Sequence, residues 1–134
     1  MTETFKFDLV SPERLLMSAN ADQVIVPGAE GDFTVLPKHA PFISTLRPGV
    51  LTASAGGAET RYFVRGGFAE VGPDELTVLA ETAMPLSELT DSALAEQIRV
   101  AQDDVANAAD DDTRFHAIDV VERLSSLRDT LKLA

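Results

Sequence analysis

Apolar and polar residues alternate in short runs over the first 85 residues of the chain. Residues 5–10 read Phe-Lys-Phe-Asp-Leu-Val, and the later apolar runs are bounded by Gly, Pro, Asn or Asp. Many short strands separated by turn residues are typical of a β-sandwich or barrel. We expect a sandwich, with strands at 5–10, 24–26, 33–36, 50–53, 61–64, 68–71 and 76–80.

Glycine and proline occur only up to Pro85, and they mark the predicted turns. Glycine permits backbone angles that other residues avoid, and proline fixes φ and removes an amide donor. The pair Gly66-Gly67 stands between two apolar strands, where such pairs usually mark a bulge or a close backbone approach. We expect tight turns at Pro27-Gly28, Pro48-Gly49, Gly56-Gly57 and Gly72-Pro73-Asp74.

Beyond Pro85 the apolar spacing becomes helical. Steps of three and four residues place apolar side chains on one stripe of a helix. They predict one helix over about 90–108, with Leu94, Ile98, Ala101 and Val105 in its stripe, and a second over about 113–133, with Val120, Leu124, Leu127 and Leu131. Phe115 and Ile118 would widen the apolar side of the second helix. The predicted fold is therefore a mainly β N-terminal sandwich, residues 1–86, followed by a C-terminal antiparallel α-helical hairpin, residues 87–134.

The first predicted helix is rich in alanine, which favours helix but offers little surface for packing. We expect the hairpin to depend on docking and to be the mobile part of the molecule.

Composition and charge limit the classes of partner that the chain is expected to bind. The chain has 134 residues, no cysteine and a formal net charge of −11, which disfavours direct binding to nucleic acid or to an anionic lipid surface. No run of about 18 apolar residues is present, so we expect no membrane-spanning helix. The first residues resemble neither a secretory signal nor a transit peptide, and a bacterial cytoplasmic product is the simplest expectation.

No catalytic, cofactor or metal site is predicted. Neither histidine has further ligands at metal spacing; we expect His116 on a helix surface and His39 in a turn or contact. The run Asp110-Asp111-Asp112 lacks the spacing of a calcium loop and suits a solvated turn that begins the second helix. Phosphate-binding glycine motifs are absent, so we do not expect an enzyme.

Three blocks of the first 86 residues resemble a known family. They are Asp8-Leu9-Val10-Ser11-Pro12-Glu13, then Glu30 through Pro41 with Pro48-Gly49 behind it, and Gly66-Gly67-Phe68-Ala69-Glu70-Val71 leading to Leu76 through Ala83. Together they resemble the ε subunit of bacterial F-type ATP synthases, in which an E-G-x-x-x-x-x-P-x-H-A-P run faces the membrane ring.

This resemblance implies a non-catalytic rotor part. The sandwich would bind the γ subunit and the loops of the c-ring, and would transmit proton-driven rotation to the catalytic head. Glu30, Asp32, Lys38 and His39 would lie at the c-ring interface. The chain would be peripheral, at the cytoplasmic side of the bacterial plasma membrane, without inserting into it.

The resemblance is weaker in the hairpin. Family members that bind ATP carry an L-D-x-x-R-A type motif, whereas this chain reads Leu89-Thr90-Asp91-Ser92-Ala93-Leu94-Ala95 and lacks the arginine in either alignment. In relatives the raised helices use basic residues to meet an acidic segment of the catalytic β subunit. Here the hairpin is mostly acidic, and its candidate contacts with the α/β catalytic subunits are Arg114, Arg123 and Arg128. We expect weak inhibition of hydrolysis at most. The alternatives are an ATP-sensing regulator of hydrolysis and a free-standing acidic binding module.

Overall fold

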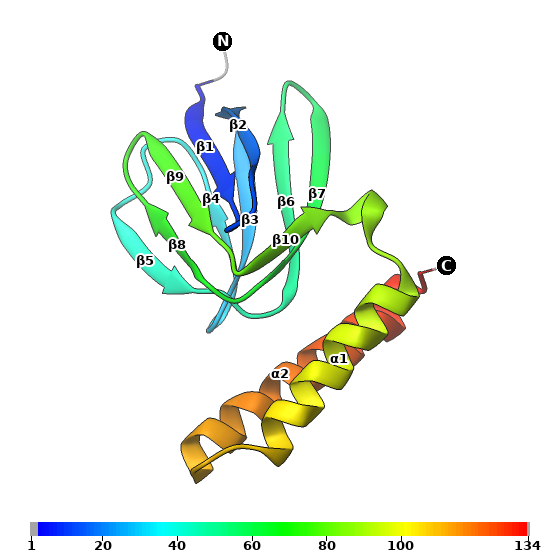
Figure 1. The fold of residues 1–134 in the computed structure, drawn as a ribbon. Helices are drawn as coiled ribbons and strands as arrows, with labels where there is room; N and C mark the ends of the chain where they lie inside the picture. The colour runs from blue at the N-terminus through cyan, green and yellow to red at the C-terminus, as the bar shows by residue number, and fades with distance from the viewer. Residues whose placement is uncertain (1–2, 134) are drawn as a thin grey trace. The chain divides into compact units, whose positions relative to one another are not determined.

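The computed structural model describes residues 3–133. It contains two compact units, Met1–Ser87 and Glu88–Ala134. The first unit is built from strands and the second from helices (Figure 1). The strands are β1 (Phe5–Val10), β2 (Leu15–Ala21), β3 (Gln23–Gly28), β4 (Gly31–Val35), β5 (Phe42–Thr45), β6 (Gly49–Ala55), β7 (Ala58–Arg65), β8 (Phe68–Val71), β9 (Glu75–Leu79) and β10 (Thr82–Pro85). A 3-10 turn, η1 (Leu86–Glu88), precedes the helices α1 (Asp91–Ala106) and α2 (Asp111–Leu131).

The strands form two five-stranded sheets. The first sheet has the order β2-β1-β9-β8-β5, and the second has the order β10-β7-β6-β3-β4. Neighbouring strands are antiparallel except β1 and β9, which are parallel. The two sheets enclose one apolar core, so the predicted sandwich is confirmed.

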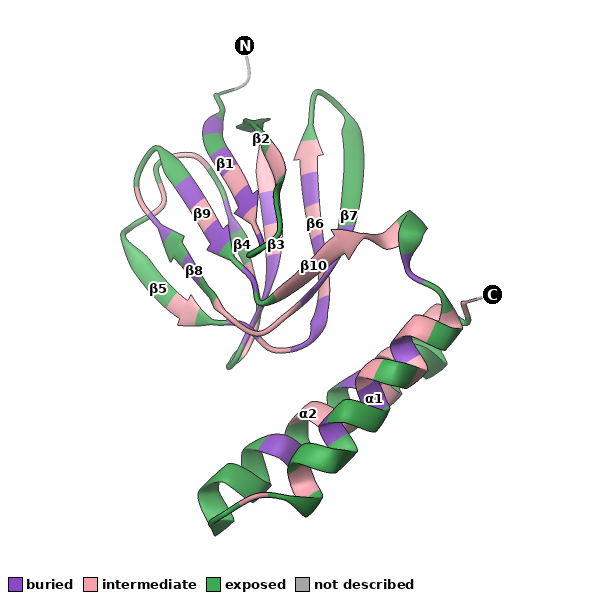
Figure 2. Cartoon of the chain, viewed as in Figure 1, coloured by how far each residue is buried: buried purple, intermediate pink, exposed green. Residues whose placement is uncertain are grey.

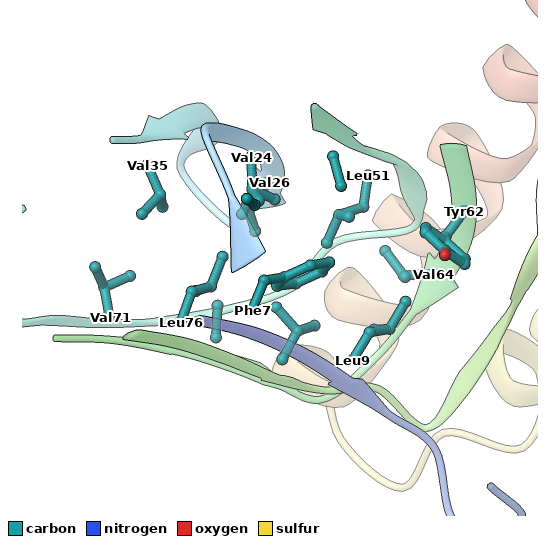
Figure 3. Close-up of a cluster of buried hydrophobic side chains, with 14 of the residues drawn as sticks. Phe7, Leu9, Val24, Val26, Val35, Leu51, Tyr62, Val64, Val71 and Leu76 are labelled. Atoms are coloured by element: carbon teal, nitrogen blue, oxygen red, sulfur yellow. The ribbon is translucent and has the colours of Figure 1, made fainter. Parts of the chain in front are cut away.

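Alternation along the strands supplies this core (Figure 3). In β1 the side chains of Phe5, Phe7 and Leu9 are buried, whereas Lys6 between them is exposed. Successive side chains of a strand point to opposite faces of the sheet, so every second residue of β1 packs against the other sheet. Val24 and Val26 of β3 contribute to the core in the same way.

Three strands, β2, β5 and β10, were not predicted, and all three are at sheet edges. An edge strand has a neighbour on one side only, and its side chains are less covered. All four residues of β10 are half-buried, and three of the four in β5 are exposed. Their sequences therefore lack the strong alternation of the central strands.

The turn prediction at Pro27-Gly28 is wrong. Both residues continue β3, and the turn to β4 is Ala29-Glu30. β6 pairs with β3 only over Gln23–Ile25. Pro27 is tolerated because no strand on that side needs a hydrogen bond from its backbone nitrogen. Gly49 likewise opens β6 and does not form part of a turn.

The other glycine predictions are confirmed. Gly56 and Gly57 join β6 to β7 with φ of 58° and 86°, and residues 72–74 join β8 to β9. Gly67 has φ of 90°, and a Cβ there would overlap the carbonyl oxygen of Leu79. The glycine is thus required by a close backbone approach.

The two helices begin at side-chain caps. The Thr90 hydroxyl accepts a hydrogen bond from the Ala93 amide at 3.1 Å, and the Asp110 carboxylate accepts one from the Thr113 amide at 2.7 Å. Each cap satisfies an amide that the helix itself leaves unpaired. The cap at Asp110 explains why α2 begins at Asp111, two residues before the predicted start.

The apolar stripes of the hairpin are largely as predicted. Leu94, Ile98, Ala101 and Leu124 are buried, and the remaining stripe residues are half-buried. Phe115 is 70% exposed, so its place in the apolar side was predicted wrongly. It lies two residues, or about 200° around the helix, from buried Ala117 and therefore faces the opposite way.

Within residues 3–133, neither helix has the length and apolar character needed to cross a membrane.

Candidate functional site

The turn between β3 and β4 carries two of the predicted site residues. Glu30 is an exposed turn residue, and Asp32 follows on β4. One carboxylate oxygen of Asp32 lies 3.2 Å from the guanidinium of Arg47, which precedes β6. Arg47 was not predicted as a site residue, because the pair spans fifteen positions of the sequence.

Lys38 and His39 lie in the loop after β4. Lys38 has φ of 65°, its amide donates to the Pro73 carbonyl at 2.8 Å, and its ammonium pairs with Glu3 at 3.1 Å. The His39 Nδ1 donates to the Ala40 carbonyl at 2.7 Å. Over the described residues, no ion pair or hydrogen bond joins Lys38 or His39 to Glu30 or Asp32.

Two phenylalanines connect the sheet edges beside this loop. The rings of Phe33, on β4, and Phe42, on β5, meet edge to face with centroids 5.3 Å apart. β4 is an edge of the second sheet and β5 an edge of the first. Phe42 remains 47% exposed, so this corner of the sandwich also presents an apolar surface.

A row of apolar side chains crosses the outer face of the first sheet. The register pairs Leu15 with Val10, Val10 with Leu79, and Leu79 with Phe68. These residues alternate with buried neighbours such as Leu9 and Val78, so their side chains point away from the core. Leu15 is 59% exposed, and Leu79 and Phe68 are each 38% exposed.

Ile43 extends this apolar surface to the edge strand β5, most of which is exposed (Figure 2). It pairs with the outward-facing Glu70 and is 67% exposed. We call Leu15, Val10, Leu79, Phe68 and Ile43 the outer row. Exposed apolar patches are a common feature of protein–protein contact sites.

The three candidate arginines of the hairpin are all paired with carboxylates. Arg114 contacts Asp111 at 3.1 Å and Arg123 contacts Asp119 at 3.6 Å, both within α2. Arg128 donates two hydrogen bonds of 2.8 Å to Asp91, at the start of α1.

The pair between Asp91 and Arg128 connects the N-terminal end of α1 to the C-terminal end of α2. It therefore joins the two ends of the chain's antiparallel hairpin. The Arg128 hydrogen bonds lower the pKa of the Asp91 carboxyl, and the same contact raises the pKa of Arg128.

The remaining polar candidates have structural explanations. Asp110 caps α2, and the hydrogen bond from the Thr113 amide lowers the pKa of its carboxyl. His116 is exposed, as expected. Over residues 3–133, no group of three or more His, Asp or Glu side chains is arranged to hold a metal ion.

Comparison with known proteins identifies the family. The family model for the β-sandwich domain of the ATP synthase delta/epsilon chain matches residues 4–86. The ATP synthase epsilon chain of Parvibaculum lavamentivorans is 51% identical over 132 residues, which cover 98% of this chain and 100% of that one. The chain belongs to the ATP synthase epsilon-chain family.

Further relatives agree with this membership. The epsilon chains of Maricaulis maris and Mesorhizobium japonicum are 47% and 46% identical, over 96% and 95% of both chains respectively. The expected resemblance is therefore confirmed, and it extends through the hairpin. Relatives in this family are non-catalytic subunits, in agreement with a chain that is not an enzyme.

Solved structures share the fold. A chain of the Euglena gracilis mitochondrial ATP synthase, from a structure of OSCP, F1 and c-ring, has a TM-score of 0.73 at 23% identity, covering 96% of this chain and 81% of that one. A chain from the central stalk and c-ring of the Tetrahymena thermophila mitochondrial enzyme has a TM-score of 0.60 at 14% identity, covering 95% and 93%. At these identities the likeness shows the fold.

Proposed function

We propose that this chain is a central-stalk subunit of a proton-translocating F-type ATP synthase and that it couples c-ring rotation to the catalytic head through γ. The outer row is the observation that carries the proposal, because a sandwich with a complete core of its own has no internal use for these exposed apolar side chains. We assign this face to γ. The subunit would be held by its partners at the cytoplasmic side of the bacterial plasma membrane.

We assign the c-ring contact to the polar residues on and after the β3–β4 turn. Glu30, Asp32, Lys38 and His39 are exposed or half-buried there, and they can form hydrogen bonds and ion pairs with polar loops.

The test is the double variant Asp32→Lys with His39→Glu, which changes the charge at both ends of this surface. Membranes that carry the complex with this variant should lose proton-coupled ATP synthesis, while γ still co-purifies with the chain. Synthesis at the wild-type rate would refute the c-ring assignment.

For the hairpin, we propose a weak or absent inhibitory effect on ATP hydrolysis. Arg114, Arg123 and Arg128 are the candidate contacts with the α/β subunits, but each is already paired with an aspartate. A contact with an acidic partner would have to replace these pairs, which offsets most of its gain. Deletion of residues 87–134 should leave hydrolysis by the assembled enzyme nearly unchanged, and an increase of several-fold would contradict the proposal.

The alternative of an ATP-sensing regulator is less well supported. Thr90 and Ala93 provide no cation for phosphates, and Arg128, which reaches the start of α1, is bound to Asp91. A free cation would be needed at this place to offset the charge of the phosphates. Isothermal titration with ATP should show no site of micromolar affinity or tighter.

A further inference from the structure

Arg47 contacts both strands of the β3–β4 tip, which is defined here as residues 27–32. Its amide donates to the Pro27 carbonyl at 3.0 Å, and its guanidinium pairs with Asp32 at 3.2 Å. Pro27 and Asp32 are register partners on β3 and β4. A single residue thus holds the two strands at the same level.

The backbone around Arg47 supports this arrangement. The Ala29 amide donates to the Thr45 carbonyl at 2.9 Å, and Leu46 forms a bridge with Gly28. Gly49 approaches Pro27 so closely that a Cβ would lie 2.9 Å from the proline Cβ. Backbone contacts therefore hold the segment 45–49 against the tip, and they fix the position of the Arg47 backbone from which the side chain extends.

The guanidinium itself is well placed for this role. Only 23% of the Arg47 side chain is exposed, against 62% for Asp32. The arginine is partly enclosed, and the carboxylate at the surface is held by it.

The same pairing decides which charge the tip presents. Arg47 neutralises Asp32, and Lys38 is neutralised by Glu3. Glu30 is exposed in the turn and forms no ion pair or hydrogen bond with any other described residue. An unpaired carboxylate at the end of a rigid hairpin suits a cationic group on a partner.

We propose that Arg47 is a positioning residue: it clamps the β3–β4 tip, cancels the charge of Asp32 and leaves Glu30 as the carboxylate offered to a cationic side chain of the ring. This proposal rests on the proposed c-ring contact.

The first experiment tests the clamp in the isolated full chain, by hydrogen exchange of the Ala29 amide. A partly exposed ion pair shifts a local equilibrium by up to about fivefold. Arg47→Gln should therefore accelerate exchange by up to about fivefold, and Arg47→Lys, which keeps the charge, should restore most of the protection. Glu30→Gln is the matched control and should exchange like the wild type. Wild-type exchange in Arg47→Gln would overturn the clamp.

The second experiment measures proton-coupled ATP synthesis by the assembled complex. Glu30→Gln should lose coupling although its tip is intact, Arg47→Gln should lose coupling with a loosened tip, and Arg47→Lys should recover it. Full coupling in Glu30→Gln, while Arg47→Gln loses it, would overturn the proposal, because Glu30 would then not be the carboxylate that the ring binds.

Failure of the proposed function would look different. In that case Arg47→Gln would loosen the tip, but every one of these variants would couple like the wild type, which overturns the ring contact and with it the positioning role.

Discussion

Replacing Ile43 with threonine should weaken binding to γ. Complete burial of an isoleucine contributes roughly 1.5–3 kcal/mol. Ile43 is 67% exposed in the free chain, so about two-thirds of that energy, about 1–2 kcal/mol, remains to be gained on docking. Since 1.4 kcal/mol corresponds to tenfold, Kd should rise roughly 5- to 30-fold. Threonine is also β-branched and keeps the preference for extended backbone.

The assay is equilibrium binding of the purified chain to purified γ, with thermal unfolding of each variant as a check on folding. Ile25→Thr is the matched control, because Ile25 points outward from the second sheet between Val24 and Val26. It should bind γ with wild-type affinity. Wild-type binding by Ile43→Thr, or an equal loss in both variants, would refute the assignment of γ to the outer row.

The remaining predictions concern stability. Gly57→Ala should cost about 1–2 kcal/mol in urea unfolding, because φ is 86° and the surrounding space is open. Gly67→Ala combines a similar φ with overlap of the Leu79 carbonyl, so it should lower the free energy of unfolding by more than Gly57→Ala does. Equal urea midpoints for the two variants would contradict the close approach of Gly67 to Leu79. The hydrogen bonds from Arg128 lower the pKa of Asp91 in the folded chain. The stability that this pair contributes is therefore complete above the unfolded pKa of about 3.9, and it is lost as pH falls through the lower folded pKa. Helix content, measured by circular dichroism, should fall on acidification, and less steeply in Asp91→Asn; identical curves would exclude this pair as a source of the acid sensitivity.

Strands and helices could be predicted from the local sequence where a single apolar pattern determines the element. The alternation over Phe5–Val10 encodes a strand buried on one face, and the spacing from Leu94 to Ala101 encodes a helix stripe. The edge strand Phe42–Thr45 was missed because edge position is a property of the sheet, and three of its four residues are exposed.

The polar contacts of the site could not be predicted, because they join distant positions. Asp32 was found through the family motif, but its partner Arg47 is brought to it by the bridge between Gly28 and Leu46. The pair of Asp91 and Arg128 spans thirty-seven positions and forms only because α2 returns along α1. Neither pair has a local signal in the sequence.

The most direct test of the account is capture of γ by the tagged wild-type chain from cells that express both proteins. The account predicts a stoichiometric complex that survives purification and forms without residues 87–134, since the outer row belongs to the sandwich. An eluate without γ would contradict the stalk function and leave only the fold and the family membership.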